Sequence, residues 1–481
     1  MVERILLRTS VVVVGVSIFS ACTMAPKYVR PEAPVAETYP DGPEEEPALH
    51  ASDLGWRDVF GDARLQALIS IALENNRDLR VAALNAERFQ ALYRIELAPL
   101  FPNVNASGTA TFQELPAAIP SSRFAPKEQY SANLNTTAWE LDLFGRIRSL
   151  SDAALERFLS SLETQRSVHL TLVAQVAIAH FQERAFAQQL ELARQTLDLV
   201  RESYHLTRRS FEAGIASELD LRTAESQVET ARFNLALYEQ RYAQAVNGLT
   251  FLLGAPIPED LPEGEPLELA SVRTNLPAGL PSDLLQRRPD ILAAEHQLKS
   301  ANASIGAARA AFFPRISLTG AAGFASTELD ELFSGDSFTW SFSPRIDIPI
   351  FQGGRLRANL DAAEVSKSIE IANYERAIQA AFREVADALA ARKAIEERVQ
   401  AQAAQVAANE RRYELAERRY RAGVDRYVTL LTAQRDLYAS QQALIDAQFE
   451  RLANLADLYR SLGGGWLETS EASARAEDSQ G

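Results

Sequence analysis

The chain has 481 residues, 47% of them hydrophobic and 8% aromatic, and a formal net charge of −15 at pH 7. Such an acidic chain is a poor partner for nucleic acid, and its single cysteine, Cys22, rules out a disulfide framework or a thiolate metal cage. The sequence has no Gly-rich phosphate loop, nucleophile elbow or metal-ligand spacing, and His180 with Glu183 is too small a set for a metal site. It therefore predicts neither an enzyme nor a protein with a metal or cofactor.

The N-terminus has the pattern of a secretory signal. Two arginines precede a short apolar run over residues 11–19, which is shorter than a membrane-spanning helix requires. The run ends at Phe19-Ser20-Ala21-Cys22, which is similar to the lipobox of bacterial lipoproteins. We interpret residues 1–21 as a lipoprotein signal peptide and Cys22 as the lipidated first residue of the mature chain. The alternative is an ordinary cleaved signal with an incidental cysteine.

A tether and a helix are expected next. Residues 22–61 are rich in proline and contain an acidic run, which is typical of an extended segment rather than a domain. From residue 62 to residue 97 apolar side chains recur at helical spacing, and Pro99 and Pro102 end the pattern.

From residue 103 the apolar period changes to that of a strand. Over residues 103–113, Val, Ala, Gly and Phe alternate with Asn, Ser, Thr and Gln. The same alternation recurs near residue 130 and twice in the second half of the chain. Alternation with period two places the polar side chains on one face of a strand and the apolar or small ones on the other. The sequence therefore predicts β-hairpins over residues 103–143 and 315–350.

Two windows of 68 residues, 146–213 and 355–422, contain no Gly and no Pro, and each lies between glycines. The second window follows the first at a fixed offset of 209 residues, and the chain matches itself without a gap from Gly145 to Gly254 at that offset. A helix of this length spans roughly 100 Å, far more than an ordinary globular helix. Apolar residues within and after the windows follow heptad steps, as in coiled coils. The chain is therefore a tandem duplication of a long helical hairpin.

These observations divide the chain into six parts. They are a signal peptide (1–21), a lipidated Pro-rich tether (22–61), a first repeat (62–254) with its long helical hairpin over 145–254, a linker (255–281), a second repeat (282–463) with its long helical hairpin over 354–463, and a disordered tail (464–481).

The strands have a length suited to an outer membrane, where about ten residues cross the apolar layer. Four strands cannot close a barrel, and an open edge is not tolerated in lipid. A barrel would therefore be shared, and three chains would supply twelve strands. The expected fold is mixed α and transmembrane β, with helical hairpins forming an α-barrel and four strands per chain contributing to a trimeric barrel. Taken singly, each strand is better explained as part of a half-buried soluble hairpin. Four such strands, placed symmetrically in a duplication and following a secretion signal, favour the shared barrel.

Several motifs together resemble the TolC-like outer membrane factors, specifically the NodT-type efflux channel lipoproteins. The resemblance covers essentially the whole mature chain. It is carried by Pro26-Lys27-Tyr28-Val29-Arg30-Pro31, Phe60-Gly61-Asp62, Trp139-Glu140-Leu141-Asp142-Leu143-Phe144-Gly145, Arg287-Arg288-Pro289-Asp290-Ile291 and Gly353-Gly354-Arg355.

The resemblance implies a homotrimer in the cell outer membrane, anchored by lipid and extending into the periplasm. It implies a passive channel that exports small molecules, with a periplasmic adaptor and an inner-membrane pump of the resistance-nodulation-division class as partners. Channels for type I protein secretion are the alternative within this family. A coiled-coil structural scaffold is the alternative of another class, and the signal sequence and alternating strands argue against it.

Two turns are predicted to be docking tips for the adaptor, because they end helices roughly 100 Å long. They are Ala213-Gly214-Ile215 and Ala422-Gly423-Val424.

The resemblance also places a pore constriction on residues 427–435. Val428 fits an apolar ring, and Arg435 fits a basic residue that holds the closed state by pairing. Related channels often have Asp where this chain has Thr432, so the ring of carboxylates is in doubt. Asp425, Asp436 or Glu225 would be the compensating carboxylates, unless each is simply a solvated charge on a helix.

Overall fold

The structure is a computed structural model that describes residues 23–36, 38–39, 50–114, 126–267, 270–277 and 281–470. Cys22 and the signal peptide lie outside the described residues. The chain divides into two compact units, each assembled from three stretches. Unit 1 comprises Met1–Glu32, Asn85–Ser161 and Ala293–Glu375, and unit 2 comprises Ala33–Leu84, Leu162–Leu292 and Arg376–Gly481. Each unit thus takes material from both sequence repeats.

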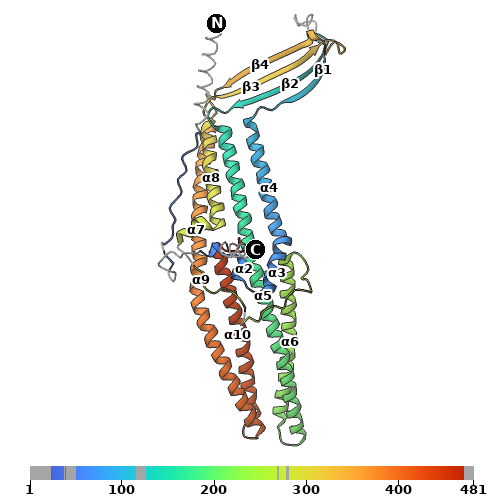
Figure 1. Cartoon of the computed structure of the whole chain (residues 1–481), viewed down its shortest axis with the longest axis vertical. Helices are drawn as coiled ribbons and strands as arrows, with labels where there is room; N and C mark the ends of the chain where they lie inside the picture. The colour runs from blue at the N-terminus through green and yellow to red at the C-terminus, as the bar shows by residue number, and fades with distance from the viewer. Residues whose placement is uncertain are drawn as a thin grey trace, which may run out of the picture. The chain divides into compact units, whose positions relative to one another are not determined.

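The described part of the chain is mostly helical, with four strands (Figure 1). Helix α2 (Trp56–Val59) precedes the first repeat, whose elements are α3 (Ala63–Asn75), α4 (Arg77–Leu97), β1 (Asn105–Phe112), β2 (Glu128–Leu141), α5 (Arg146–Glu212) and α6 (Glu218–Leu253). In the second repeat they are α7 (Pro281–Arg287), α8 (Pro289–Ala310), β3 (Arg315–Ser326), β4 (Phe338–Asp347), α9 (Arg355–Arg421) and α10 (Tyr427–Ser461).

The predicted duplication appears in the helix bounds. Helices α5 and α9 each have 67 residues, and both ends of α9 follow those of α5 by the sequence offset of 209. The glycines that border them, Gly145, Gly214, Gly354 and Gly423, all have positive φ. Such a φ strains other residues, so glycine marks where each long helix begins and ends.

The four strands form one antiparallel sheet in the order β1-β2-β3-β4 (Figure 1). Both expected hairpins are present, and β2 also pairs with β3. The register pairs apolar or small residues with one another and polar or small residues with one another across the sheet. One row of directly paired residues is Ala106, Leu134, Ala322 and Trp340, and the adjacent row is Ser107, Asn133, Gly323 and Thr339.

Because successive residues point to opposite faces, the sheet has one apolar face and one polar or small face. The sequence did not predict the irregularity in β2, where the register shifts between Thr136 and Trp139 and Ala138 has a φ of 49°.

In unit 1 the start of the tether is held by specific contacts. The carboxylate of Glu295 on α8, whose side chain is 3% exposed, accepts hydrogen bonds from Tyr28 Oη at 3.0 Å and from Arg30 Nη2 at 2.7 Å. Burial alone would raise the pKa of Glu295, but the bond from Arg30 and the charge of Lys299 lower it. The described start of the tether is therefore docked along α8 rather than free. Its end departs from the expected extended segment, because Ala51–Asp53 and Trp56–Val59 are helical and Trp56 is buried.

In unit 2 the described end of the chain packs against α2. The backbone N–H groups of Trp56 and Arg57 donate to the carbonyls of Leu467 and Glu468. Ser470 bonds Asp58 through both its backbone and its side chain. The structure differs here from the expected disordered tail over 464–481, because residues 464–470 satisfy the free backbone groups of a short helix. Residues 471–481 lie outside the described part.

A buried hydrogen bond between Asp62 and His180 joins the start of α3 to α5 in unit 2. Asp62 caps α3 by accepting a hydrogen bond from the backbone N–H of Arg64, and its other oxygen lies 3.0 Å from Nε2 of His180. The two side chains are 5% and 1% exposed. Burial acts to raise the pKa of Asp62, but the bonds from His180 and the backbone outweigh it, so the pKa is lowered.

Replacing Asp62 by Ala should lower the stability of the helical assembly by about 2 kcal/mol, from the lost cap and the unpaired buried imidazole. Asp62→Asn keeps an acceptor for the helix N-terminus and should cost less. A carboxylate with a lowered pKa stabilises the fold above its usual pKa, and this contribution is lost as the pH falls below about 4. Thermal unfolding followed by circular dichroism at pH 7 and pH 3 measures both effects, and equal unfolding temperatures for the wild type and Asp62→Ala at pH 7 would contradict them.

Candidate gate and docking tips

The two predicted tips are identical turns that close the helical hairpins of unit 2. At the first, the N–H of Gly214 donates to the carbonyl of Phe211 and that of Ile215 donates to the carbonyl of Ser210. At the second, Gly423 and Val424 repeat the pattern with Tyr420 and Arg419 as acceptors. This is the Schellman arrangement, which requires a residue of positive φ. Gly214 and Gly423 have φ values of 75° and 71°.

The tips present apolar side chains to solvent. Ile215 is 83% exposed, Leu219 75% and Val424 65%. A Schellman turn commonly packs the residue after its glycine against the helix, but here Ile215 and Val424 remain exposed. A side chain added at Gly214 or Gly423 would meet nothing within 4 Å. Both tips are therefore open surfaces with apolar residues available for contact.

The three predicted gate residues share one face of α10. Val428, Thr432 and Arg435 are exposed and follow one another at spacings of four and three, while Tyr427, Leu431 and Gln434 beside them are buried. Residues at these spacings lie on one helix face. The structure brings the three together on a continuous exposed stripe.

The carboxylates considered as partners of Arg435 are engaged elsewhere in the same chain. Asp425 accepts a hydrogen bond from Arg419 at 2.7 Å, which lowers the pKa of Asp425. Asp436 pairs with Arg412 at 2.5 Å. Glu225 pairs with Arg222 at 2.9 Å.

Within the described residues Arg435 has no ion pair. The exposed stripe of a single chain thus carries one uncompensated positive charge.

Polar and aromatic side chains that the sequence analysis did not single out join the two hairpins. Near the tips, Tyr427 and Leu431 of α10 pack against Ala224 of α6. The hydroxyl of Ser203 on α5 donates a hydrogen bond to the hydroxyl of Tyr427 at 3.4 Å. Farther along α10, Gln442 donates to Tyr238 at 2.7 Å.

Gln189 of α5 also donates to Asp446 of α10 at 2.7 Å. The sequence shows only that Gln and Tyr occur on these long helices, which does not reveal their partners.

Burial also affects the tyrosines at these contacts. It raises the pKa of Tyr438, which accepts a hydrogen bond from Gln442, to about 12. The phenol is therefore neutral at physiological pH and keeps its hydrogen available for donation.

Two further kinds of feature, a metal-binding cluster and a membrane-crossing helix, are absent from the described residues. No cluster of three or more His, Cys, Asp or Glu side chains there is arranged to hold a metal ion. None of the helices described combines the length and the apolar character needed to cross a membrane.

Comparison with known proteins agrees with this architecture. The family model for outer membrane efflux proteins matches the chain twice, over residues 68–255 and 280–464, which follow the two repeats. The chain is 50% identical over 466 residues to a probable efflux pump outer membrane protein, TtgC, of Pseudomonas putida, covering 95% of this chain and 96% of TtgC. It is 42% identical over 449 residues to the outer membrane protein OprJ of Pseudomonas aeruginosa, covering 93% and 94% of the two chains.

Solved structures show the same fold. A membrane protein from Pseudomonas aeruginosa superposes with a TM-score of 0.87 at 42% identity, covering 93% of this chain and 98% of its own. The open state of the Neisseria gonorrhoeae MtrE outer membrane channel gives a TM-score of 0.85 at 41% identity, covering 94% and 100%. The fold expected from the sequence is confirmed, and the chain belongs to the outer membrane efflux protein family.

Proposed function

We propose that three copies of this chain form a passive outer membrane channel for an efflux pump. The observation that carries the proposal is the four-stranded sheet, whose register gathers large apolar side chains on one face. Trp340 is 71% exposed, Ile346 61% and Phe342 60%. Exposed aromatic and aliphatic side chains in this density are costly in water and favourable against lipid.

The sheet edges set the number of chains. In the order β1-β2-β3-β4, the outer edges of β1 and β4 have no strand partner among the described residues. Unpaired backbone groups are not tolerated in lipid, and outer membrane barrels have at least eight strands. Three copies, with β1 of one paired to β4 of the next, close a barrel of twelve strands. The polar rows of the sheet then face a water-filled lumen.

The long helical hairpins continue the conduit into the periplasm, where the tips engage an adaptor that connects to an inner-membrane pump of the resistance-nodulation-division class. The channel itself is passive, because the sequence has no phosphate-binding loop to harness nucleotide hydrolysis. The lipid-anchored Cys22 provides a second attachment to the outer membrane.

Small organic compounds are the proposed cargo. The similar Pseudomonas putida proteins carry names for antibiotic, toluene and solvent efflux. No feature of the chain favours the alternative of protein secretion over this one.

The first test is assembly and conduction. The protein purified in mild detergent should have the mass of three chains and should form ion-conducting pores in planar bilayers, because only a closed barrel leaves no unpaired strand edge in lipid. Light scattering and single-channel recording provide the two measurements. A stable monomer that inserts and conducts would refute the shared barrel.

Docking at the tips is tested by Gly214→Asp and Gly423→Asp. Each substitution puts a charged side chain on an open apolar surface, at a position whose positive φ is unfavourable for any residue other than glycine. We expect efflux to fall at least about tenfold while trimer insertion is kept. Gly335→Asp is a matched control, since Gly335 also has open space around it but lacks a positive φ. Solvent tolerance of a strain that carries the cognate pump is the readout, and full tolerance in both tip variants would exclude tip docking.

The gate is tested by Thr432→Asp. Three carboxylates around a narrow pore attract cations, so cation selectivity in planar-bilayer recordings should rise above that of the wild type. Ser226→Asp adds the same charge to an exposed position of α6 and should have little effect. If both variants change selectivity equally, or neither changes it, residue 432 does not line the constriction.

A further inference from the structure

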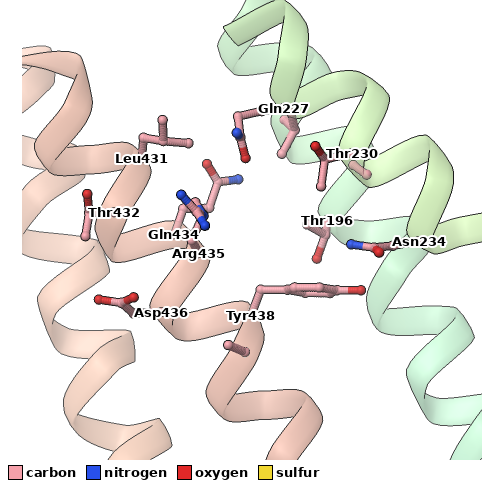
Figure 2. A pocket seen from close by; sticks show the side chains of 13 residues that line it. Thr196, Gln227, Thr230, Asn234, Leu431, Thr432, Gln434, Arg435, Asp436 and Tyr438 are labelled. Atoms are coloured by element: carbon pink, nitrogen blue, oxygen red, sulfur yellow. The ribbon is translucent and has the colours of Figure 1, made fainter. Parts of the chain in front are cut away.

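A cavity of about 420 Å³ lies between α10 and the hairpin of α5 and α6 in unit 2. Its lining residues come from all three helices: Thr196, Val200, Gln227, Thr230, Ala231, Asn234, Leu431, Thr432, Gln434, Arg435, Asp436, Tyr438 and Ala439. Figure 2 shows the side chains of α10 on one side of this space and those of Gln227, Thr230 and Asn234 on the other. A cavity of this size accommodates a small organic molecule.

The cavity is bounded by fixed contacts along α10. On one side of it, Tyr427 and Leu431 pack against Ala224. On the other side, the hydrogen bond from Gln442 to Tyr238 holds α10 to α6. Along α10, the two hairpins are therefore in contact on both sides of the cavity, and the space between these contacts is called the gap below.

One buried polar group in the lining lacks a partner. Gln434 is only 8% exposed, and its Nε2 has no hydrogen-bond partner among the described residues. A buried donor without an acceptor costs about 1–3 kcal/mol. The amide thus provides a desolvated donor at the wall of the gap, for which an acceptor on a bound molecule would remove the cost.

The charge of the lining favours an anion. Arg435 and Asp436 are the two charged residues that line the gap. Asp436 is neutralised by Arg412 at 2.5 Å, whereas Arg435 has no ion pair within the described residues. A guanidinium beside an amide N–H is suited to a carboxylate, which accepts hydrogen bonds on both oxygens. Val200 and Leu431 supply apolar surface for the remainder of such a molecule.

We propose that this gap is a binding site for a small organic carboxylate, whose anionic group is held by Gln434 and Arg435 and whose apolar body lies against Val200 and Leu431. The site goes beyond passive conduction and does not depend on it. A ligand there bridges α10 to α6, so it stabilises the approach of the two hairpins by mass action.

The test uses the full-length trimer in lipid nanodiscs and 2-naphthoate as the probe, measured by isothermal titration calorimetry. Arg435→Gln and Gln434→Leu should each weaken binding at least tenfold. Since replacing an unpaired buried amide by an apolar side chain of similar size is nearly neutral or stabilising, Gln434→Leu should keep the wild-type unfolding temperature without probe. Thr230→Trp, at an exposed position on the rim, should fill the gap and abolish binding.

Two controls separate the site from non-specific uptake. Arg418→Gln removes the same charge from an exposed position of α9 outside the gap and should bind as the wild type does. The neutral compound 2-naphthylmethanol should bind at least tenfold more weakly than 2-naphthoate. Absence of binding to the wild type, equal binding by Arg435→Gln and Arg418→Gln, or equal binding of the neutral compound would each overturn the proposal.

Discussion

The constraint on which the molecule depends is that a four-stranded antiparallel sheet cannot complete itself. Its register places Leu134 and Trp340 in one row and Asn133 and Thr339 in the next, so apolar and polar faces are sharply separated. The apolar face remains exposed in a single chain, and β1 and β4 have free outer edges in the described structure. Both costs disappear at once when copies pair edge to edge in lipid. Oligomerisation and membrane insertion are thus one requirement rather than two.

The helices meet a different constraint, which is continuity. A continuous helix of 67 residues is favoured by the absence of Gly and Pro from its interior, and both long helices lack them. The same glycine that is excluded from the interior is required where the helix ends. At Gly214 and Gly423 the positive φ allows the chain to reverse within a few residues, leaving Ile215 and Val424 exposed beyond it. Length and tip geometry are therefore consequences of where glycine occurs.

At the contact between the hairpins, some polar side chains have a hydrogen-bond or ion-pair partner and others do not. Gln189 and Gln442 reach partners on the opposite hairpin, and Asp425 and Asp436 are paired within their own hairpin. Gln434 Nε2 and the Arg435 guanidinium have no such partner among the described residues, and the two residues are neighbours on α10 at the wall of one gap.

The sequence by itself determined the periodic and local features. Period-two alternation located the strands, the gaps between glycines located α5 and α9, and the fixed offset revealed the duplication, because these depend only on backbone propensities and on which residues share a face. Heptad steps likewise indicated that the long helices pack against other helices, and residues such as Ile378, Val385, Leu452 and Tyr459 are buried. The fold class follows from the same reasoning, whereas Val428, Thr432 and Arg435 were placed by the resemblance to a known family.

Only the tertiary structure decided the contacts between residues distant in the chain. The pairing of β2 with β3, the docking of Tyr28 and Arg30 on Glu295, the packing of residues 464–470 on α2 and the pair of Asp62 with His180 each join segments more than 100 residues apart. No local propensity encodes such partners, since a buried carboxylate or amide can be satisfied by any donor that the fold brings near it. The cavity beside Gln434 is the clearest example of a feature that the sequence does not predict, because its walls come from three helices, α5, α6 and α10.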